Sequence, residues 1–211
     1  MMTTLDDLQD DIQFMHKYNV TPEYYEKQMH RVPSFPVVDR VSYILDHSKN
    51  KRVLHLGCSS GYLHSHIAKV SKELTGWDIE PYPGTPIGNF VLLDLDEQIN
   101  CCGFRGKFDL VVVAEILEHL GNPGNILKNL KNIEAPLLIT VPNAFSAVGR
   151  YHLSGGVENV HKQHTAWYSW RTLLTLIERY GYEAQDFAWY NCPKGAQPHE
   201  AEGLIVLTSG S

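Results

Sequence analysis

Short apolar runs alternate with amphipathic segments along most of this 211-residue chain. Apolar runs bounded by turn residues predict strands, whereas apolar positions that recur every three or four residues predict helices. By these patterns, strands are predicted at 51–56, 74–77, 90–93, 108–114, 137–141, 182–189 and 204–208. Helices are predicted at 37–47, 62–70, 122–130 and 172–180. The continuous run from Phe108 to Ala114 is typical of a central parallel strand buried on both faces.

The regular alternation of strand and helix predicts the fold class, which is α/β with a Rossmann-like, doubly wound sheet. Seven strands are expected, mostly parallel, and the last two have no helix between them, which predicts an antiparallel hairpin at the C-terminal end. Upstream, 4–18 and 22–30 read as amphipathic helices rich in Tyr and Met. We therefore expect an N-terminal helical segment at 1–36, acting as a cap or a packing arm, and a main domain at 37–211.

Composition narrows the class of protein without changing the predicted fold. Hydrophobic residues make up 43% and charged residues 20%, which indicates a globular chain. The net charge of −6 argues against a protein whose main task is to grip a phosphate backbone. The sequence has no apolar run of membrane-spanning length and an acidic N-terminus unlike a signal peptide. These features predict a cytoplasmic protein without a membrane span.

The four cysteines add little to this description. Cys101 and Cys102 are adjacent, while Cys58 and Cys192 stand alone. This spacing indicates neither a zinc ribbon nor a disulfide framework. Reduced thiols are therefore expected, in keeping with a cytoplasmic location.

The most specific motif lies where the strand at 51–56 meets the helix at 62–70. Residues 53–63 read VLHLGCSSGYL, and Asp78 ends the next strand about 20 residues further on. A strand, a tight turn that opens a helix, and such a carboxylate bind the adenosine part of a cofactor. Only Gly57 and Gly61 are present, with Ser59 where a dinucleotide site has its middle glycine. No Gly-Lys-Ser/Thr follows, so the turn favours a cofactor without phosphates.

Further blocks follow this turn in a recognisable order. They are GWDIE at 76–80, VLLDLDE at 91–97, FDLVVVAEILEHL at 108–120, NP at 122–123, LITVPN at 138–143 and WYS at 167–169. Together with 53–61, they make the chain resemble class I S-adenosylmethionine-dependent methyltransferases from about residue 37 to the end. The bacterial type 11/23 kind, which accompanies glycan and small-molecule biosynthesis, is the nearest in appearance. The resemblance implies S-adenosylmethionine as the cofactor.

The resemblance also implies roles for single residues in the first half of the motif set. Gly57, Cys58, Ser59 and Gly61 would form the turn beneath the methionine part of the cofactor. His55 stands where the family often has an acidic residue, and it is expected to hydrogen-bond the turn.

The remaining cofactor-binding residues would follow the later strands. Asp78, with Ile79 beside it, would accept hydrogen bonds from both ribose hydroxyls, because a carboxylate offers two acceptors to a vicinal diol. Asp94 would accept from the adenine amino group, and the Leu95 amide would meet the ring. Ala114 and Glu115 would lie near the sulfonium.

Histidines supply the candidate catalytic groups. Methyl transfer is an in-line displacement in which the protein supplies position and, for an oxygen nucleophile, often a base. His119, His161 and His164 are the candidate bases, since imidazole titrates near neutral pH. His152 also lies near a strand end, inside the stretch 144–160, which is predicted to be a mobile lid loop. Ser169 is expected to cap the helix that follows it.

One arrangement raises the question of a metal. If 115–119 is helical, Glu115, Glu118 and His119 share a face at i, i+3 and i+4, and His161 or His164 would complete a divalent-cation site. Similar blocks occur in metal-dependent ribose methyltransferases of small RNAs and, more widely, in methyltransferases without metal. A divalent metal is therefore an open alternative, and a structural or cofactor-lining role is favoured.

Three functions remain open at this stage. The favoured one is O-methylation of a small-molecule or sugar acceptor. The second is a metal-dependent ribose methyltransferase acting on RNA, against which the acidic balance counts. The third is an inactive, cofactor-binding partner subunit, for which His55 and Ser59 are the only hints. The sequence does not identify the acceptor, and it leaves a homodimer open.

Overall fold

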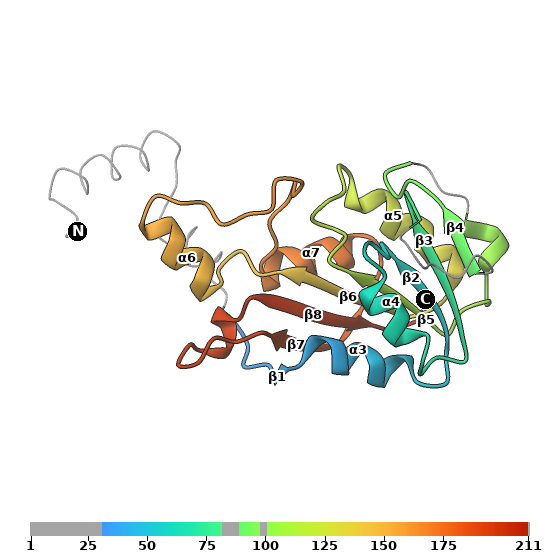
Figure 1. Ribbon diagram of the computed structural model, residues 1–211, viewed down its shortest axis with the longest axis horizontal. Coiled ribbons are helices and arrows are strands. Elements are labelled where there is room, and N and C mark those ends of the chain that lie inside the picture. Colours follow the sequence, from blue (N-terminus) through green and yellow to red (C-terminus); the bar gives the residue numbers. More distant parts are fainter. Residues whose placement is uncertain (1–30, 82–88, 98–100, 211) are drawn as a thin grey trace, which may run out of the picture. The chain divides into compact units, whose positions relative to one another are not determined.

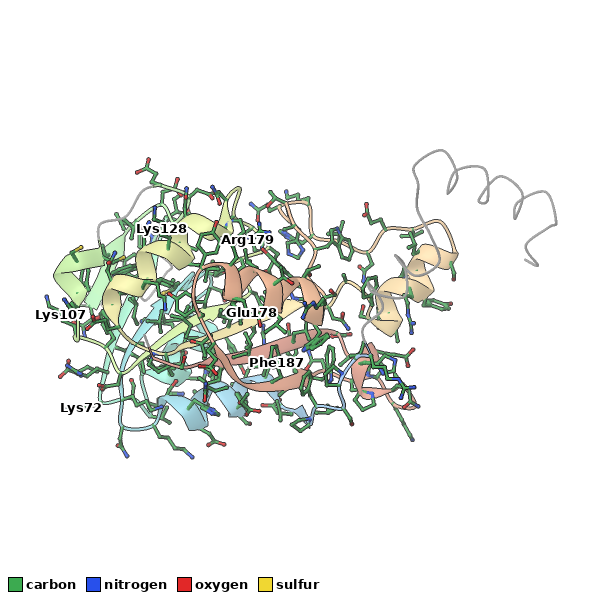
Figure 2. The ribbon with its side chains drawn as sticks, turned by 180° about the vertical axis from the view of Figure 1, so that it is seen from behind. Lys72, Lys107, Lys128, Glu178, Arg179 and Phe187 are labelled. Carbon is green, nitrogen blue, oxygen red and sulfur yellow. The ribbon has the colours of Figure 1, made fainter. Side chains whose placement is uncertain are left out.

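The computed structural model describes residues 31–81, 89–97 and 101–210. The chain divides into two compact units, 1–33 and 34–211, and every element described below belongs to the second. The helices expected at 4–18 and 22–30 lie outside the described residues. Phe35 belongs to the second unit, where its ring stacks on Phe187 at a centroid distance of 5.0 Å; Figure 2 labels Phe187.

A mixed sheet of eight strands forms the centre of this unit (Figure 1). The strands are β1 (Val37–Val38), β2 (Arg52–Leu56), β3 (Glu73–Asp78), β4 (Phe90–Leu92), β5 (Leu110–Ala114), β6 (Leu137–Pro142), β7 (Ala184–Tyr190) and β8 (Gly203–Thr208). Their order is β1-β7-β8-β6-β5-β2-β3-β4. Every pair is parallel except those that β8 makes with β6 and β7. The doubly wound fold and the antiparallel C-terminal strand are confirmed.

The eighth strand corrects the expected number of seven. The stretch 37–47 was predicted to be one helix, but Val37 and Val38 pair in parallel with β7. The helix begins only at Arg40, because Asp39 is its N-cap and accepts a hydrogen bond from the Ser42 amide at 2.7 Å. Two β-branched residues before a capping aspartate therefore join the sheet and not the helix.

Helices cover both faces of the sheet. They are α3 (Arg40–Ser48), α4 (Tyr62–Ile67), α5 (Pro123–Leu130), α6 (Ala147–Ser154) and α7 (Trp170–Arg179), with short 3-10 turns at Cys101–Phe104, Lys131–Ile133 and Pro198–Glu200. On one face, Ile44 of α3 and Ile67 of α4 pack with Val112. On the other, Leu127 of α5 and Ile177 of α7 pack in a second cluster. Every residue of β5 is buried, as its apolar run predicted.

Two helix termini bear on the sequence predictions. Ser169 caps α7 as expected, and Thr172 completes a capping box with it. The stretch 144–160 was predicted to be a loop, but residues 147–154 form α6, which Ser146 caps through the Gly149 amide. No residue of α6 is buried, so the helix carries no apolar periodicity by which the sequence could reveal it.

The carboxyl ends of β2 and β5 position the site. These strands are neighbours, but β3 extends the sheet on one side of them and β6 extends it on the other. Such a switch point in a doubly wound sheet leaves a crevice at the carboxyl ends of the strands. The turn that follows Leu56 and the segment that follows Ala114 both lie at this edge.

Candidate active site

The turn from Gly57 to Gly61 owes its shape to its glycines. Gly57 has φ +68° and Gly61 has φ +78°, in the left-handed region that favours glycine. The Gly57 amide donates to the Trp77 carbonyl at 2.8 Å, which ties the turn to β3. A Cβ at Gly57 would also overlap the side chain of Ile116. Ser59 adopts φ +45°, an uncommon conformation for a residue with a side chain.

Asp78 connects the end of β3 to this turn. Its Oδ2 accepts a hydrogen bond from the Ser59 amide at 2.7 Å, and its Oδ1 accepts one from the Ile79 amide at 2.7 Å. Each carboxylate oxygen can accept a second hydrogen bond, so the group retains capacity for a ligand. The structure therefore brings Asp78, Ser59 and Ile79 together.

The strand β4 continues this edge toward Asp94 and Leu95. The Leu93 amide donates to the Asp78 carbonyl at 2.8 Å, so the chain leaves β4 beside Asp78. Asp94 accepts a hydrogen bond from the Asp96 amide at 2.9 Å, and Leu95 is buried. Ile79, in contrast, is 66% exposed and offers an apolar surface at this edge.

Glu115 is held by residues from three other elements. Its Oε1 accepts hydrogen bonds from the hydroxyls of Thr140 on β6 and Tyr190 on β7, both at 2.7 Å. Arg40 of α3 forms an ion pair with the same oxygen at 3.4 Å. Glu115 itself has φ +55°. Sequence analysis found Glu115 but missed its three partners, because no local pattern connects positions so far apart in the chain.

Tyr190 reaches Glu115 because of a glycine on the neighbouring strand. Tyr190 pairs with Gly203 of β8, and a Cβ at Gly203 would overlap the tyrosine ring. Burial and the Glu115 carboxylate raise the pKa of Tyr190 far above its usual range. The hydroxyl therefore remains a hydrogen-bond donor at any physiological pH.

A cavity of about 320 Å³ opens at this edge of the sheet. Side chains from α3, the ends of β5 to β8, α6 and the segment before α7 line it, among them Arg40, Glu115, Asn143, Ser146, Asn159, His161, His164, Trp167, Tyr168, Tyr190, Asn191 and Glu202. Of the candidate bases, His161 and His164 lie on this lining. His152 is on α6 beside Tyr151.

His119, His161 and His164 form one cluster, called here the cleft histidines. One nitrogen from each ring lies within 4.8 Å of the others, and the rings of His119 and His164 are 4.6 Å apart at their centroids. Burial lowers the pKa of His119 and His164, and neighbouring imidazoles lower it further. The neutral form is the one that accepts a proton or binds a metal.

The glutamates expected beside them are placed differently. Residues 115–120 are not helical; the His119 amide closes a turn onto the Ile116 carbonyl at 3.0 Å. Glu118 is 1% exposed, and neither carboxylate oxygen has a hydrogen-bond partner among the described residues. Burial, with a smaller effect of Glu115, raises the pKa of Glu118 to about 8. Of the metal set Glu115, Glu118, His119 and His164, the histidines cluster and the glutamates lie outside.

His55 lies beneath the turn, where it is almost fully buried. Its ring faces His64 on α4, with 3.2 Å between the two Nδ1 atoms. Sequence analysis did not find His64 as a partner. The two rings meet because the chain reverses at the turn, so that α4 packs back over the end of β2.

The strand order and the turn at the switch point define a class I S-adenosylmethionine-dependent methyltransferase fold. The family described as a methyltransferase domain matches residues 25–186, so the chain belongs to it. The expected family and its cofactor, S-adenosylmethionine, are thereby confirmed. Among the described residues, no helix has the length and apolar character needed to cross a membrane.

Two curated relatives are ubiquinone biosynthesis O-methyltransferases. The one from Shewanella pealeana is 27% identical over 95 residues, which cover 41% of this chain and 40% of the relative. The one from Proteus mirabilis is 27% identical over 124 residues, or 52% and 48% of the two chains. The chain thus matches less than half the length of each of these relatives.

Solved structures share the fold at low identity. A SAM-dependent methyltransferase from Archaeoglobus fulgidus has a TM-score of 0.63 and 15% identity, over 93% of this chain and 98% of that chain. A small RNA methyltransferase has a TM-score of 0.64 and 14% identity, over 87% and 27%. The 1,6-didemethyltoxoflavin-N1-methyltransferase of Burkholderia thailandensis has a TM-score of 0.58 and 16% identity, over 81% and 76%.

Proposed function

We propose that this protein is an S-adenosylmethionine-dependent O-methyltransferase that acts on a small-molecule or sugar hydroxyl. The observation that carries the proposal is the cavity at the strand edge, where His161 and His164 face the same space as Glu115. Its volume of about 320 Å³ is at the small end of ligand pockets and suits a compact acceptor. The ubiquinone biosynthesis O-methyltransferases among the relatives support oxygen as the methylated atom.

The turn and the two carboxylates after it fit the cofactor. Asp78 retains acceptor capacity for the ribose diol, and the exposed Ile79 offers an apolar face to the adenine. Asp94 and Leu95 would hold the adenine edge, and Gly57, Cys58, Ser59 and Gly61 the methionine part. When bound, the cofactor supplies a methyl group on a positively charged sulfonium.

The remaining chemistry falls to side chains of the cleft. His164 accepts the proton from the acceptor hydroxyl, because its pKa is lowered and its ring is neutral at working pH. His119 and His161 hold that ring in place by edge and tilted contacts. Glu115, fixed by Thr140 and Tyr190, orients the cofactor's ammonium group or the acceptor beside Ala114.

The test is a product assay. The full-length protein is incubated with S-adenosylmethionine and a panel of small phenols, catechols and sugars, and mass spectrometry detects O-methylated products. We expect turnover on at least one hydroxyl acceptor and a loss of about 10²-fold in kcat for His164→Ala. His66→Ala, which removes a partly exposed histidine on α4, is the matched control. Methylation of nitrogen or carbon acceptors alone would contradict the proposal.

A second candidate is a metal-dependent ribose methyltransferase acting on RNA. The cleft histidines favour it, since three imidazole nitrogens within 4.8 Å of one another suit a divalent ion. Glu118, whose carboxylate has no hydrogen-bond partner among the described residues, could turn toward such an ion and ionise there. Acceptor and chelator together separate the two candidates. Turnover that survives chelation excludes this one, whereas turnover on small RNA that stops with chelator, and that is also lost in His119→Ala, supports it.

A further inference from the structure

Three buried side chains meet beneath the turn, away from the cleft. His55 comes from β2, Cys58 from the turn and His64 from α4, and they are 1%, 3% and 4% exposed. We call them the turn cluster. The two Nδ1 atoms are 3.2 Å apart, and the Cys58 sulfur is 3.4 Å from His64 Nδ1. One ligand atom from each residue lies within 4.8 Å of the others.

The two separations that His64 makes match the edges of a metal's coordination shell. A tetrahedral zinc ion with Zn–N of about 2.0–2.1 Å and Zn–S of about 2.3 Å holds its ligand atoms about 3.3–3.6 Å apart. The two observed distances lie within about 0.2 Å of that range. Two imidazoles and a thiol are borderline-soft donors, which select zinc over magnesium or calcium.

The neighbouring strand leaves room for this arrangement. Gly76 of β3 lies beside His55 in the parallel register. A Cβ built on Gly76 would stand 2.7 Å from the Cys58 sulfur and 2.8 Å from His64 Cε1. Any other residue at this position would force the Cys58 and His64 side chains to shift.

The cluster is buried but accessible from one side. A surface cavity of about 260 Å³ reaches His64 and is lined by Ala68, Ser71, Lys72, Glu73, Leu74 and Asn89. Figure 2 labels Lys72, one of the residues that line this cavity. A buried ligand set with such a path meets two requirements for a metal site, namely the right donors and a route for the ion.

We propose that His55, Cys58 and His64 bind a zinc ion, which fixes the cofactor turn to β2 and α4. On binding, the S–H bond of Cys58 breaks, a zinc–sulfur bond forms and the proton leaves to solvent. Water completes the fourth position. This inference concerns metal binding and does not depend on the proposed methyl transfer.

Protonation is in keeping with this chemistry. Burial lowers the pKa of both histidines, so their rings are neutral and able to act as ligands. Burial also raises the pKa of the Cys58 thiol to about 12. Zinc must displace that proton, so its affinity should rise with pH.

Cobalt substitution provides the test. The reduced, full-length protein is stripped of metal with chelator and titrated with Co²⁺, and near-ultraviolet absorption reports thiolate-to-cobalt charge transfer. We expect one equivalent of Co²⁺ to produce the band and Zn²⁺ to abolish it. The cleft histidines include no thiol and cannot give this signal.

Variants assign the band to the cluster. Cys58→Ser and His64→Ala should lower the Co²⁺ affinity at least 10-fold and remove the band, whereas His66→Ala on the same helix should keep it. The absence of a band in the wild type overturns the proposal and indicates a purely hydrogen-bonded cluster. A band that persists in Cys58→Ser overturns it too. If the variants fail to fold, a zinc-induced rise in the melting temperature of the wild type, detected together with its cobalt band, decides the question.

Discussion

The turn cluster and the cleft histidines place the same side chain in opposite surroundings. His55 and His64 are enclosed at the end of β2, beside a thiol, whereas His161 is exposed and His164 borders an open cavity. Burial alone lowers the pKa of His64, while neighbouring imidazoles add to the effect of burial at His164. Enclosed histidines can fix a backbone turn, and only open ones can reach a substrate. The number of histidines in a sequence does not reveal this distinction.

The largest expected effect is on affinity for the cofactor, which should depend on the turn and hardly on the cleft histidines. Asp78→Ala removes the carboxylate that holds the turn and would receive the ribose, and charge-assisted hydrogen bonds contribute about 1.5–3 kcal/mol each. We expect calorimetry to show affinity for S-adenosylmethionine at least 10-fold lower. His164→Ala, in the cleft, should bind the cofactor nearly as the wild type does. Equal losses in both variants would show that the regions do not act separately.

The next effect concerns the glycines. Gly57→Ala should destabilise the fold by about 2–4 kcal/mol, because φ is +68° and the new methyl group would overlap Ile116. Gly156, which follows α6, is the matched control, with φ +76° and open space around it, so Gly156→Ala should cost only about 1 kcal/mol. Denaturant unfolding measures both. A similar cost for the two variants would mean that packing under the turn contributes nothing.

A third expectation concerns the buried Glu118 and the pH dependence of the protein's stability. The folded-state pKa of Glu118 is raised to about 8 from 4.5, so its protonated form stabilises the fold fully below about pH 4.5. That contribution is lost as pH rises through 8. In chelator, Glu118→Gln should therefore melt several degrees above the wild type at pH 9, and the difference should shrink toward pH 5. Parallel melting curves across this range would contradict the raised pKa.

The smallest effect lies away from both regions and serves as a baseline. Asp109 accepts hydrogen bonds from the Arg52 guanidinium and backbone amide, which lower its pKa to about 2. This stability is present above about pH 3.8 and lost as pH falls through 2. Because the pair is partly exposed, Asp109→Asn should cost about 1 kcal/mol at pH 7. Acid unfolding of the variant should depend less on pH near 3, with cofactor binding unchanged.

The sequence predicted the sheet well because its signals are local. A few consecutive residues are enough to recognise each of three features: the apolar run of β5, the turn residues after β2 and the carboxylate at the end of β3. Asp78 and Ser59 were expected at one site, and they hydrogen-bond there. The role of these residues in binding the cofactor stays a prediction.

The rest of the site depends on contacts between distant segments. Arg40, Thr140 and Tyr190 converge on Glu115 from α3, β6 and β7, and no periodicity connects them. The helical spacing on which the metal alternative depended is not found, because residues 116–119 form a turn. Likewise, α6 was hidden by its lack of buried residues.

Gly203 influences the shape of the cleft from a neighbouring strand, through the Tyr190 ring. It lies on β8, and its missing side chain is the space that the Tyr190 ring occupies. A methyl group added there would tilt the ring, shift the hydroxyl from Glu115 and reshape the cavity wall, although no lining residue had changed. An engineer who wishes to alter acceptor preference while keeping every polar group of the cleft can therefore begin one strand away, with the smallest residue of the pair.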